Sequence, residues 1–286
     1  MNSIQRLINR FYQFNIAEKI ILINVICFVL PFFIKTLLFL FNLPEHTFFS
    51  WFELSPHPST FIFQPWTLIS YGFLHGSFGH ILWNMLLLYY AAQFFLNLFS
   101  PKRFLNVYFS GIIAGGVVFM LSYALFPVFE GHYPSLVGAS AGVMAVLIFS
   151  CTYMPNQEIR LLFFNVKLMY LGIGLVVLDV LQIPTGNAGG HIAHIGGAAL
   201  GFLYASQLQK GNDIGRGFDW VIESITAMFK PKKTMETVHK AKRKSRQPSY
   251  VKSQKEIDTI LDKISDSGYE SLSKEEKELL FKAGKN

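Results

Sequence analysis

The chain has 286 residues, of which 51% are hydrophobic and only 15% are charged, and 29 are Phe. Soluble domains carry about 25% charged residues, so this composition excludes a soluble globular protein of this length. The charge is also unevenly placed, because 29 of the 43 Lys, Arg, Asp and Glu residues lie from Lys210 onward. We therefore predict that the chain before Lys210 is embedded in a membrane and that the tail is not. The net charge of +7 comes mostly from this tail, which argues against binding to nucleic acid.

Six apolar segments follow an N-terminal arm, residues 1–19, and each is interpreted as a membrane-spanning helix. About 20 helical residues are needed to cross the hydrocarbon core of a bilayer, and the fourth segment is shorter than that. The expected fold is therefore an all-α polytopic membrane protein with its membrane core at 20–209. The six segments are Ile20–Phe41, His80–Phe99, Phe104–Phe126, Ser140–Tyr153, Leu161–Ile183 and His191–Leu208.

Basic residues alternate between the two sides of these segments. Lys102 and Arg103 follow the second segment, Arg160 follows the fourth, and the N-terminal arm and the tail are basic, whereas the intervening loops contain no Lys or Arg. Short loops rich in Lys and Arg stay in the cytosol, so both termini are predicted to be cytosolic. The long outer loop, residues 42–79, is rich in aromatic residues and is expected to lie in the membrane interface.

The tail is expected to contain two parts, 210–252 and 253–286. Apolar residues at helical spacing in Asp213–Lys230 predict an amphipathic helix on the inner membrane face. The basic segment Lys240–Arg246 is expected to be attracted to anionic lipid. The last part is predicted to be a small helical hairpin that docks on a cytosolic partner, from an apolar stripe, a turn at Ser267-Gly268 and a capping box at Ser273–Glu276. The stripe is Ile257, Ile260, Leu261 and Ile264.

Polar residues inside a bilayer are costly, so each one there is a candidate functional residue. At 1.5 Å of rise per residue, Asn84, Ser140 and His194 all lie about 20–22 Å above the cytosolic ends of their segments. His80 lies one helical turn above Asn84 on the same face. Three residues of three different segments thus converge on one depth, with His80 one turn above them, which predicts a site. The full set of polar candidates is His75, His80, Asn84, Ser140, Asp179, His191 and His194.

Small residues surround two of these candidates. Gly138-Ala-Ser140-Ala-Gly142 matches the G-x-S-x-G pattern of a serine nucleophile, although no strand is expected before it. The same glycines, and Gly197-x-x-x-Gly201 in the sixth segment, form small-x-x-x-small patterns that allow helices to approach closely. Close approach is what a serine and a histidine on different helices require to react together.

These motifs resemble those of the rhomboid intramembrane serine proteases. The family pattern is H-x-x-x-N in the second core helix, G-x-S-[GA] at the start of the fourth and A-H-x-x-G in the sixth. This chain has His80-Ile-Leu-Trp-Asn84, Gly138-Ala-Ser140-Ala and Ala193-His194-Ile-Gly-Gly197 in that order. The resemblance spans about residues 15–208 and is greatest to bacterial members. It implies a six-helix bundle with a short fourth helix that starts mid-membrane, in a bacterial plasma membrane.

The resemblance also implies roles for individual residues. Ser140 would be the nucleophile and His194 the general base of a Ser–His dyad. His80 and Asn84, with the Ser140 amide, would bind the oxyanion. The substrates would be transmembrane helices of other proteins, cut near their outer end, and no cofactor or metal is expected.

Several other residues near the expected site are predicted to have lesser roles. No acidic residue is expected at the catalytic depth to orient the imidazole. Asp179, near the outer end of the fifth segment, is the one candidate exception, and the favoured prediction is that it packs or faces the cavity. His191 is expected either to hydrogen-bond behind the catalytic residues or to lie at the cavity rim, and the rim is favoured. Met144 stands where the family often has an aromatic residue against the imidazole, and Trp66-Thr67 replaces the usual Trp-Arg pair of the first outer loop.

Three alternatives come from other classes of protein. A metalloprotease would require H-E-x-x-H, which the sequence lacks. A small transporter would also place His and Asp within the membrane, but it predicts internal repeats that are not found. An inactive rhomboid-like protein that binds membrane clients should lack Ser140 or His194, and both are present.

Overall fold

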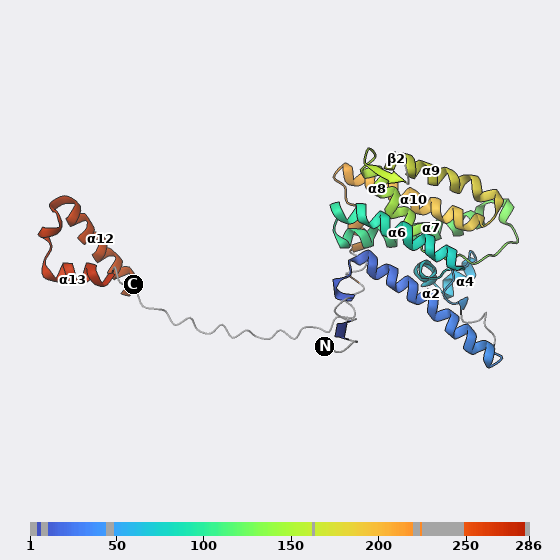
Figure 1. Cartoon of the computed structure of the whole chain (residues 1–286), viewed down its shortest axis with the longest axis horizontal. Helices are drawn as coiled ribbons and strands as arrows, with labels where there is room; N and C mark the ends of the chain where they lie inside the picture. The colour runs from blue at the N-terminus through green and yellow to red at the C-terminus, as the bar shows by residue number, and fades with distance from the viewer. Residues whose placement is uncertain are drawn as a thin grey trace. The chain divides into compact units, whose positions relative to one another are not determined.

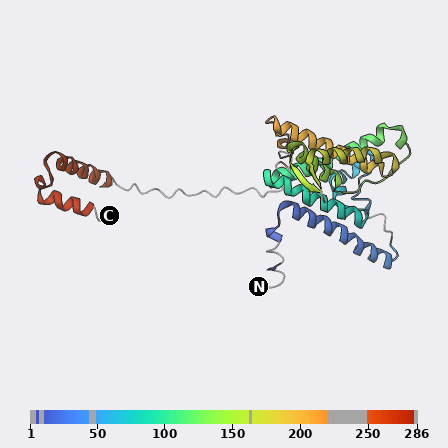
Figure 2. The same ribbon diagram turned by 45° about the horizontal axis from the view of Figure 1, so that its top comes forward.

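A computed structural model of the chain describes residues 5–6, 11–43, 49–161, 164–219, 224 and 249–283. The chain divides into two compact units, Met1–Phe229 and Lys230–Asn286. Figures 1 and 2 show the first unit as a bundle of helices and the second as a helical hairpin. The predicted limits of the membrane core, at 20–209, and of the two parts of the tail, at 210–252 and 253–286, remain predictions.

Six apolar helices form the bundle of the first unit, as predicted. Four of them are long and apolar enough to cross a membrane by length and composition: α2, α6, α7 and α9, the last counted with the short turn that follows it. The protein is therefore a helical, polytopic membrane protein. The six helices are α2 (Ile16–Leu40), α6 (Phe78–Leu98), α7 (Pro101–Leu125), α8 (Ser140–Tyr153), α9 (Leu168–Gln182) and α10 (Ala188–Gln209).

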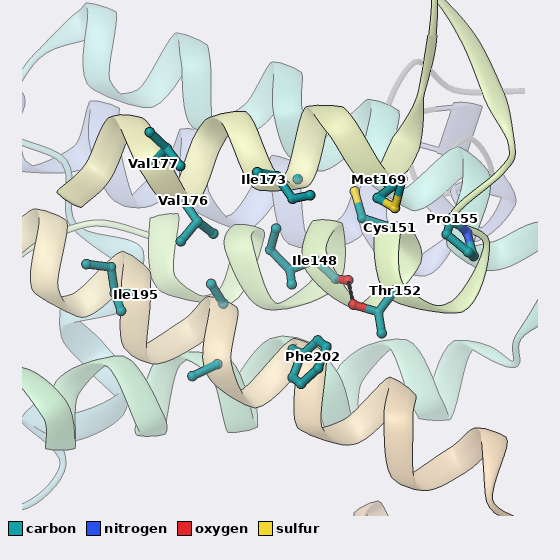
Figure 3. A pocket seen from close by; sticks show the side chains of 13 residues that line it. Ile148, Cys151, Thr152, Pro155, Met169, Ile173, Val176, Val177, Ile195 and Phe202 are labelled. Atoms are coloured by element: carbon teal, nitrogen blue, oxygen red, sulfur yellow. Dashed lines mark hydrogen bonds between the residues drawn. The ribbon is translucent and has the colours of Figure 1, made fainter. Parts of the chain in front are cut away.

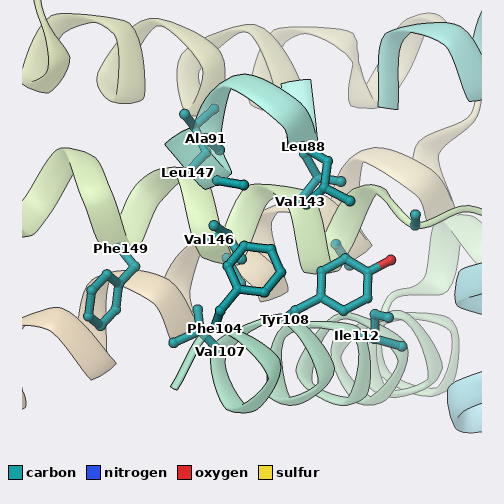
Figure 4. Close-up of a cluster of buried hydrophobic side chains, with 14 of the residues drawn as sticks. Leu88, Ala91, Phe104, Val107, Tyr108, Ile112, Val143, Val146, Leu147 and Phe149 are labelled. Atoms are coloured by element: carbon teal, nitrogen blue, oxygen red, sulfur yellow. The ribbon is translucent and has the colours of Figure 1, made fainter. Parts of the chain in front are cut away.

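Helix α8 is the centre of the bundle and contacts α6, α7, α9 and α10. Every residue from Ala141 to Cys151 is buried. A helix that is apolar on all sides is stable only where other elements cover it completely, which explains why this short helix needs no polar face. Figure 4 shows side chains of α6, α7 and α8 meeting in this core, among them Leu88, Phe104, Tyr108, Val143 and Val146.

Helix α2 lies beside α6 and exposes most of its apolar surface, as expected of a helix that faces lipid. Its start is fixed by a reciprocal capping box in which the Glu18 amide donates to Asn15 Oδ1 and the Asn15 amide donates to Glu18 Oε2. Such a box satisfies amides that the first turn leaves without partners. The helix begins at Ile16, four residues before the predicted start.

The predicted start of the fifth span, Leu161, is wrong. Two antiparallel strands, β1 (Glu158–Leu161) and β2 (Phe164–Lys167), precede α9, and Arg160 pairs with Asn165. The apolar sequence runs from Leu161 into the helix almost without a break, so hydropathy alone does not separate strand from helix. As a result α9 begins only at Leu168 and Lys167 lies outside the span.

The outer loop between α2 and α6 contains two short helices, α4 (Pro58–Phe63) and α5 (Thr67–Ser70), and the turn η1 (Tyr71–Phe73). Trp51 and Trp66 stack with ring centroids 6.0 Å apart, and Trp66 Nε1 donates to the Trp51 carbonyl at 2.7 Å. Both indole rings remain about half exposed. Thr67, at the position of the usual arginine, donates instead to the Gln64 carbonyl.

The second unit contains α12 (Ser249–Ser267), the turn η4 (Tyr269–Ser271) and α13 (Lys274–Ala283). The predicted capping box is confirmed, since the Ser273 amide donates to Glu276 Oε2 and the Glu276 amide donates to Ser273 Oγ. Lys263 of α12 reaches across to Glu276 at 3.0 Å. The predicted segment Lys240–Arg246 and most of Asp213–Lys230 lie outside the described residues.

Candidate active site

Ser140 is the first residue of α8, and the segment before it is held in place by backbone hydrogen bonds. Leu54 and Leu136 pair through both of their amides, and the Gly138 amide donates to the Tyr71 carbonyl at 2.9 Å. The cap residue of α8 is Ala139, which has no side-chain acceptor. The amides of the first turn of a helix lack partners within the helix, and their dipoles favour negative charge. Ser140 therefore lies at an uncapped helix N-terminus that suits an anion.

Gly138 leaves a small space between two candidate side chains. Its φ is +134°, in a region that strongly favours glycine. A Cβ at this position would lie 2.8 Å from Nε2 of His80 and 3.3 Å from Oγ of Ser140. The imidazole of His80 and the hydroxyl of Ser140 thus border the same space, although they come from helices far apart in the sequence.

His80 and Asn84 lie in the first turns of α6, on one face. The helix is capped by Ser77, whose Oγ accepts from the His80 amide. Asn84 is buried, and its Nδ2 donates to the His80 carbonyl at 2.8 Å, so one of its two amide hydrogens is used within the helix. The ring of His75, in the loop before α6, meets the ring of His80 edge-on with centroids 5.1 Å apart. Both histidines thus lie at the N-terminal end of α6.

The glycines of α10 bring His194 toward α8. A Cβ on Gly197 would lie 2.1 Å from the carbonyl oxygen of Ala141, and one on Gly201 would lie 2.3 Å from that of Ala145. Gly197 is one turn after His194, and Ala141 follows Ser140 directly. Ser140 Oγ donates no hydrogen bond to any other described residue, and such catalytic bonds are often long before substrate binds.

Asp179, for which packing or facing the cavity was the favoured prediction and orienting the imidazole the alternative, contacts both histidines of α10. Its Oδ1 lies 2.8 Å from Nδ1 of His194 and 2.8 Å from Nδ1 of His191. The carboxylate is buried, at 7% exposure, and joins α9 to α10. His191, predicted to lie at the cavity rim, is held in the same cluster.

The sequence contained a signal for this cluster. Asp179 is three residues from the end of α9, and His191 and His194 are close to the start of α10. The two helices are separated only by the turn Ile183–Thr185 and by the cap residues Gly186 and Asn187. Antiparallel helices with so short a connection place these side chains at one level.

The three side chains also have the composition of a metal site, because one ligand atom from each lies within 4.8 Å of the others. Zinc is bound by His nitrogen and carboxylate oxygen at about 2.0–2.2 Å, usually with four ligands. Here both imidazoles address the same carboxylate oxygen at hydrogen-bond distance. The geometry therefore fits two N–H donors on one acceptor.

Met144 takes no part in this polar cluster. It is buried together with Ile148 and Ala198. Beside these residues, α8, α9 and α10 enclose an apolar cavity of about 600 Å³, shown in Figure 3. Its lining includes Cys151, Val176 and Ile195 and contains no acidic or basic side chain. The cavity includes Ile195, the residue after His194, but none of the polar residues of the candidate site lines it.

Two family models match the chain. The Rhomboid domain matches residues 63–210, and a family of unknown function, DUF6576, matches residues 249–285. The first match contains all the residues of the candidate site, and the second contains the helical hairpin.

Rhomboid-like relatives match about half of the chain. RHOMBOID-like protein 12, mitochondrial, from Arabidopsis thaliana is 33% identical over 51% of this chain and 47% of its own length. Presenilin-associated rhomboid-like protein, mitochondrial, from Mus musculus is 30% identical over 46% of this chain and 35% of its own. Rhomboid-like protein 17, chloroplastic, from Arabidopsis thaliana is 26% identical over 51% of this chain and 50% of its own.

The chain thus spans half or less of each of these relatives. Their names place them in mitochondria and chloroplasts, so they do not support the predicted bacterial plasma membrane. The Rhomboid domain model, by contrast, covers just over half of the chain. The chain therefore belongs to the rhomboid family.

Proposed function

We propose that the protein is an intramembrane serine endopeptidase that cleaves transmembrane helices near their outer end. Ser140 is the nucleophile, His194 is the general base, and His80, Asn84 and the Ser140 amide bind the oxyanion. The observation that supports this most directly is the small space above Gly138, which Ser140 Oγ and His80 Nε2 border together at the uncapped start of α8.

The reaction follows from these positions. As Ser140 Oγ attacks the carbonyl carbon of the substrate, its proton passes to Nε2 of His194. The carbonyl oxygen becomes negative, and hydrogen-bond donors beside Gly138 stabilise it. The protonated His194 then donates its proton to the leaving amine, the peptide bond breaks, and water hydrolyses the acyl-enzyme by the same two proton transfers in turn.

The substrate must unwind before it is cut. A helix in lipid has all its backbone groups bonded, and each unsatisfied group there costs several kcal/mol. We therefore propose that the substrates are membrane proteins whose helices are weakened by Gly or Pro near the outer boundary. The lipid bilayer is the second partner, both termini face the cytosol, and the hairpin at 249–283 binds a cytosolic partner.

The test is cleavage of a single-span reporter by the full chain in liposomes. Ser140→Ala and His194→Ala should reduce cleavage to background, and His80→Ala should lower the rate by about 10²–10³. Ser150→Ala is the matched control, since Ser150 is a buried serine of the same helix whose hydroxyl donates only to the Val146 carbonyl. It should cleave at the wild-type rate.

Labelling separates an active enzyme from an inactive binding protein. A serine-directed phosphonate should label wild-type protein and Ser150→Ala at Ser140, and should not label Ser140→Ala. The proposal fails if Ser140→Ala and His194→Ala both cleave as fast as wild type. It also fails if wild-type protein neither cleaves the reporter nor takes the label.

A further inference from the structure

The carboxylate of Asp179 connects two histidines through a single oxygen. Nδ1 of His191 and Nδ1 of His194 each lie 2.8 Å from Oδ1. All three side chains are largely buried, with exposures of 10% for Asp179, 14% for His191 and 21% for His194. The cluster is thus shielded from solvent. A hydrogen bond to a charged group is stronger in such a buried environment than in water.

The chemistry of the groups determines which atom is the donor in these two hydrogen bonds. An ionised carboxylate only accepts hydrogen bonds, so at these distances each Nδ1 carries the hydrogen. A neutral imidazole has one protonated nitrogen, so Nε2 of His194 is then free to accept a proton. This is the tautomer that a general base for Ser140 requires.

We propose that Asp179 is a positioning residue that fixes this tautomer of His194 and the orientation of its ring. The proposal rests on the proposed function, because it concerns the base of the same reaction. His191 is the second donor, and its hydrogen bond holds the carboxylate oxygen in place between the two rings. The site is therefore a dyad supported by an acid from α9, where the sequence predicted a dyad alone.

The orientation follows from the helix hairpin. Asn187, before α10, has φ +49°, and the turn Ile183–Thr185 reverses the chain between α9 and α10. His191 and His194 are three residues apart and so share a face of α10. The end of α9 returns alongside that face, which places one carboxylate between both rings.

The first measurement reads the tautomer directly and does not depend on activity. Nitrogen-15 spectra of the full chain labelled at histidine should show the His194 ring protonated at Nδ1 and not at Nε2. Asp179→Asn should change this pattern, because the amide nitrogen donates to Nδ1 where the carboxylate accepted from it. Unchanged His194 signals in Asp179→Asn would overturn the proposal, even if the protein proved not to be a protease.

The second measurement is kinetic. Asp179→Asn should lower kcat by about 10²–10⁴ with KM within about threefold of wild type, as for the corresponding change in soluble serine proteases. Asp179→Glu keeps the carboxylate and should recover part of the loss. Asp213→Asn is the matched control, since Asp213 is a partly buried carboxylate that, like Asp179, accepts from two side-chain donors. It should leave kcat unchanged.

The outcomes separate the two proposals. If Ser140→Ala and His194→Ala abolish cleavage and Asp179→Asn keeps kcat within threefold, the proposed function stands and the role of Asp179 fails. If instead the three side chains hold a metal, EDTA should shift the His194 signals and alter cleavage, and this also overturns the tautomer proposal. Spectra and rates that do not change with EDTA support it.

Discussion

At the scale of single residues, Gly138 is the position on which the candidate site depends most. Its φ of +134° lies in a region that L side chains rarely adopt, and its hydrogen occupies the space between His80 and Ser140. An alanine at this position would strain the backbone, and its methyl group would collide with His80 and crowd Ser140. Both effects act within the oxyanion site of the proposed reaction.

Gly138→Ala should therefore lower kcat by about 10²–10³, the usual loss when an oxyanion donor is displaced. Gly131→Ala is the control, because Gly131 is in the same loop and also has a positive φ, of +78°, but its Cβ would meet nothing within 4 Å. The control carries the backbone strain without the collision. Reporter cleavage measures both, and equal losses in the two variants would show that strain alone is responsible.

The sequence predicted the serine, the histidines and the asparagine because polar residues are rare in apolar segments. It named Asp179 as the one candidate acid but favoured another role for it, for a geometric reason. From the predicted start at Leu161, Asp179 would lie about 27 Å up the fifth span, above the level of Ser140. From the observed start at Leu168 it lies about 17 Å up the helix. The unpredicted β-hairpin thus placed the acid above His194 in the sequence-based picture.

At the scale of elements, glycines set the distance between helices. The predicted small-residue pattern of α10 is confirmed, because Gly197 and Gly201 face the backbone of α8. The pattern on α8 is confirmed at Gly142, where a Cβ would lie 2.9 Å from the Tyr108 carbonyl oxygen of α7, but not at Gly138, which precedes the helix. Spacing in a sequence identifies a face that permits close approach, but it does not name the helix that approaches.

Gly201→Ala should lower the unfolding temperature in detergent. The new Cβ would lie 2.3 Å from the Ala145 carbonyl oxygen, which is backbone and yields only if the helices separate. Overpacking of this kind costs about 1–3 kcal/mol. Gly174→Ala in α9 is the control with the opposite sign, because its Cβ meets nothing within 4 Å and alanine favours a helix over glycine by about 1 kcal/mol. A temperature that rises in both variants would contradict the packing argument.

Another set of contacts between elements lies at the start of α7 and the end of α10. Asp213, after α10, accepts from Arg103 Nη2 at 2.8 Å and from the hydroxyl of Tyr204 at 2.7 Å. Lys102 and Asn106, also of α7, contact Asp219. The residues after the last span are thus fastened to α7 by polar contacts, at least as far as Asp219.

This set of contacts predicts a dependence of stability on pH. Burial raises the pKa of Asp213, but hydrogen bonds from Arg103, Tyr204 and the Gly215 amide outweigh it and hold the pKa below its usual range. A carboxylate with a lowered pKa stabilises the fold above its unfolded pKa of about 3.9 and loses that contribution as pH falls through the folded pKa. Asp213→Asn should therefore cost about 1.5–3 kcal/mol at neutral pH.

Unfolding in detergent across pH checks this sign. The difference between wild type and Asp213→Asn should be constant near neutrality and should shrink below about pH 4. A difference that grows as pH falls would mean that the carboxylate is not stabilised by its donors.

At the scale of the whole molecule, the chain combines two units with different physical requirements. The first buries an apolar helix, α8, at its centre and exposes apolar side chains on α2 and α9. The second is a short hairpin of charged helices in which Ile260 and Leu272 are the buried apolar residues of the part that the structure describes. We therefore expect a change of solvent to affect the stability of the two units differently.

Every contact that builds the candidate site lies in the first unit, between Leu54 and Gly201. A chain that ends before Ser249 should therefore keep the unfolding temperature of the membrane core and the wild-type kcat on a single-span reporter in detergent. The hairpin has its own stabilising contacts, the capping box at Ser273 and the ion pair of Lys263 with Glu276. Lys263→Ala in the full chain should then lower the helicity of the hairpin without changing kcat. A truncated chain that folds but has lost most of its kcat would show instead that the hairpin acts on the site, and it would make the DUF6576 segment a regulator of the Rhomboid domain.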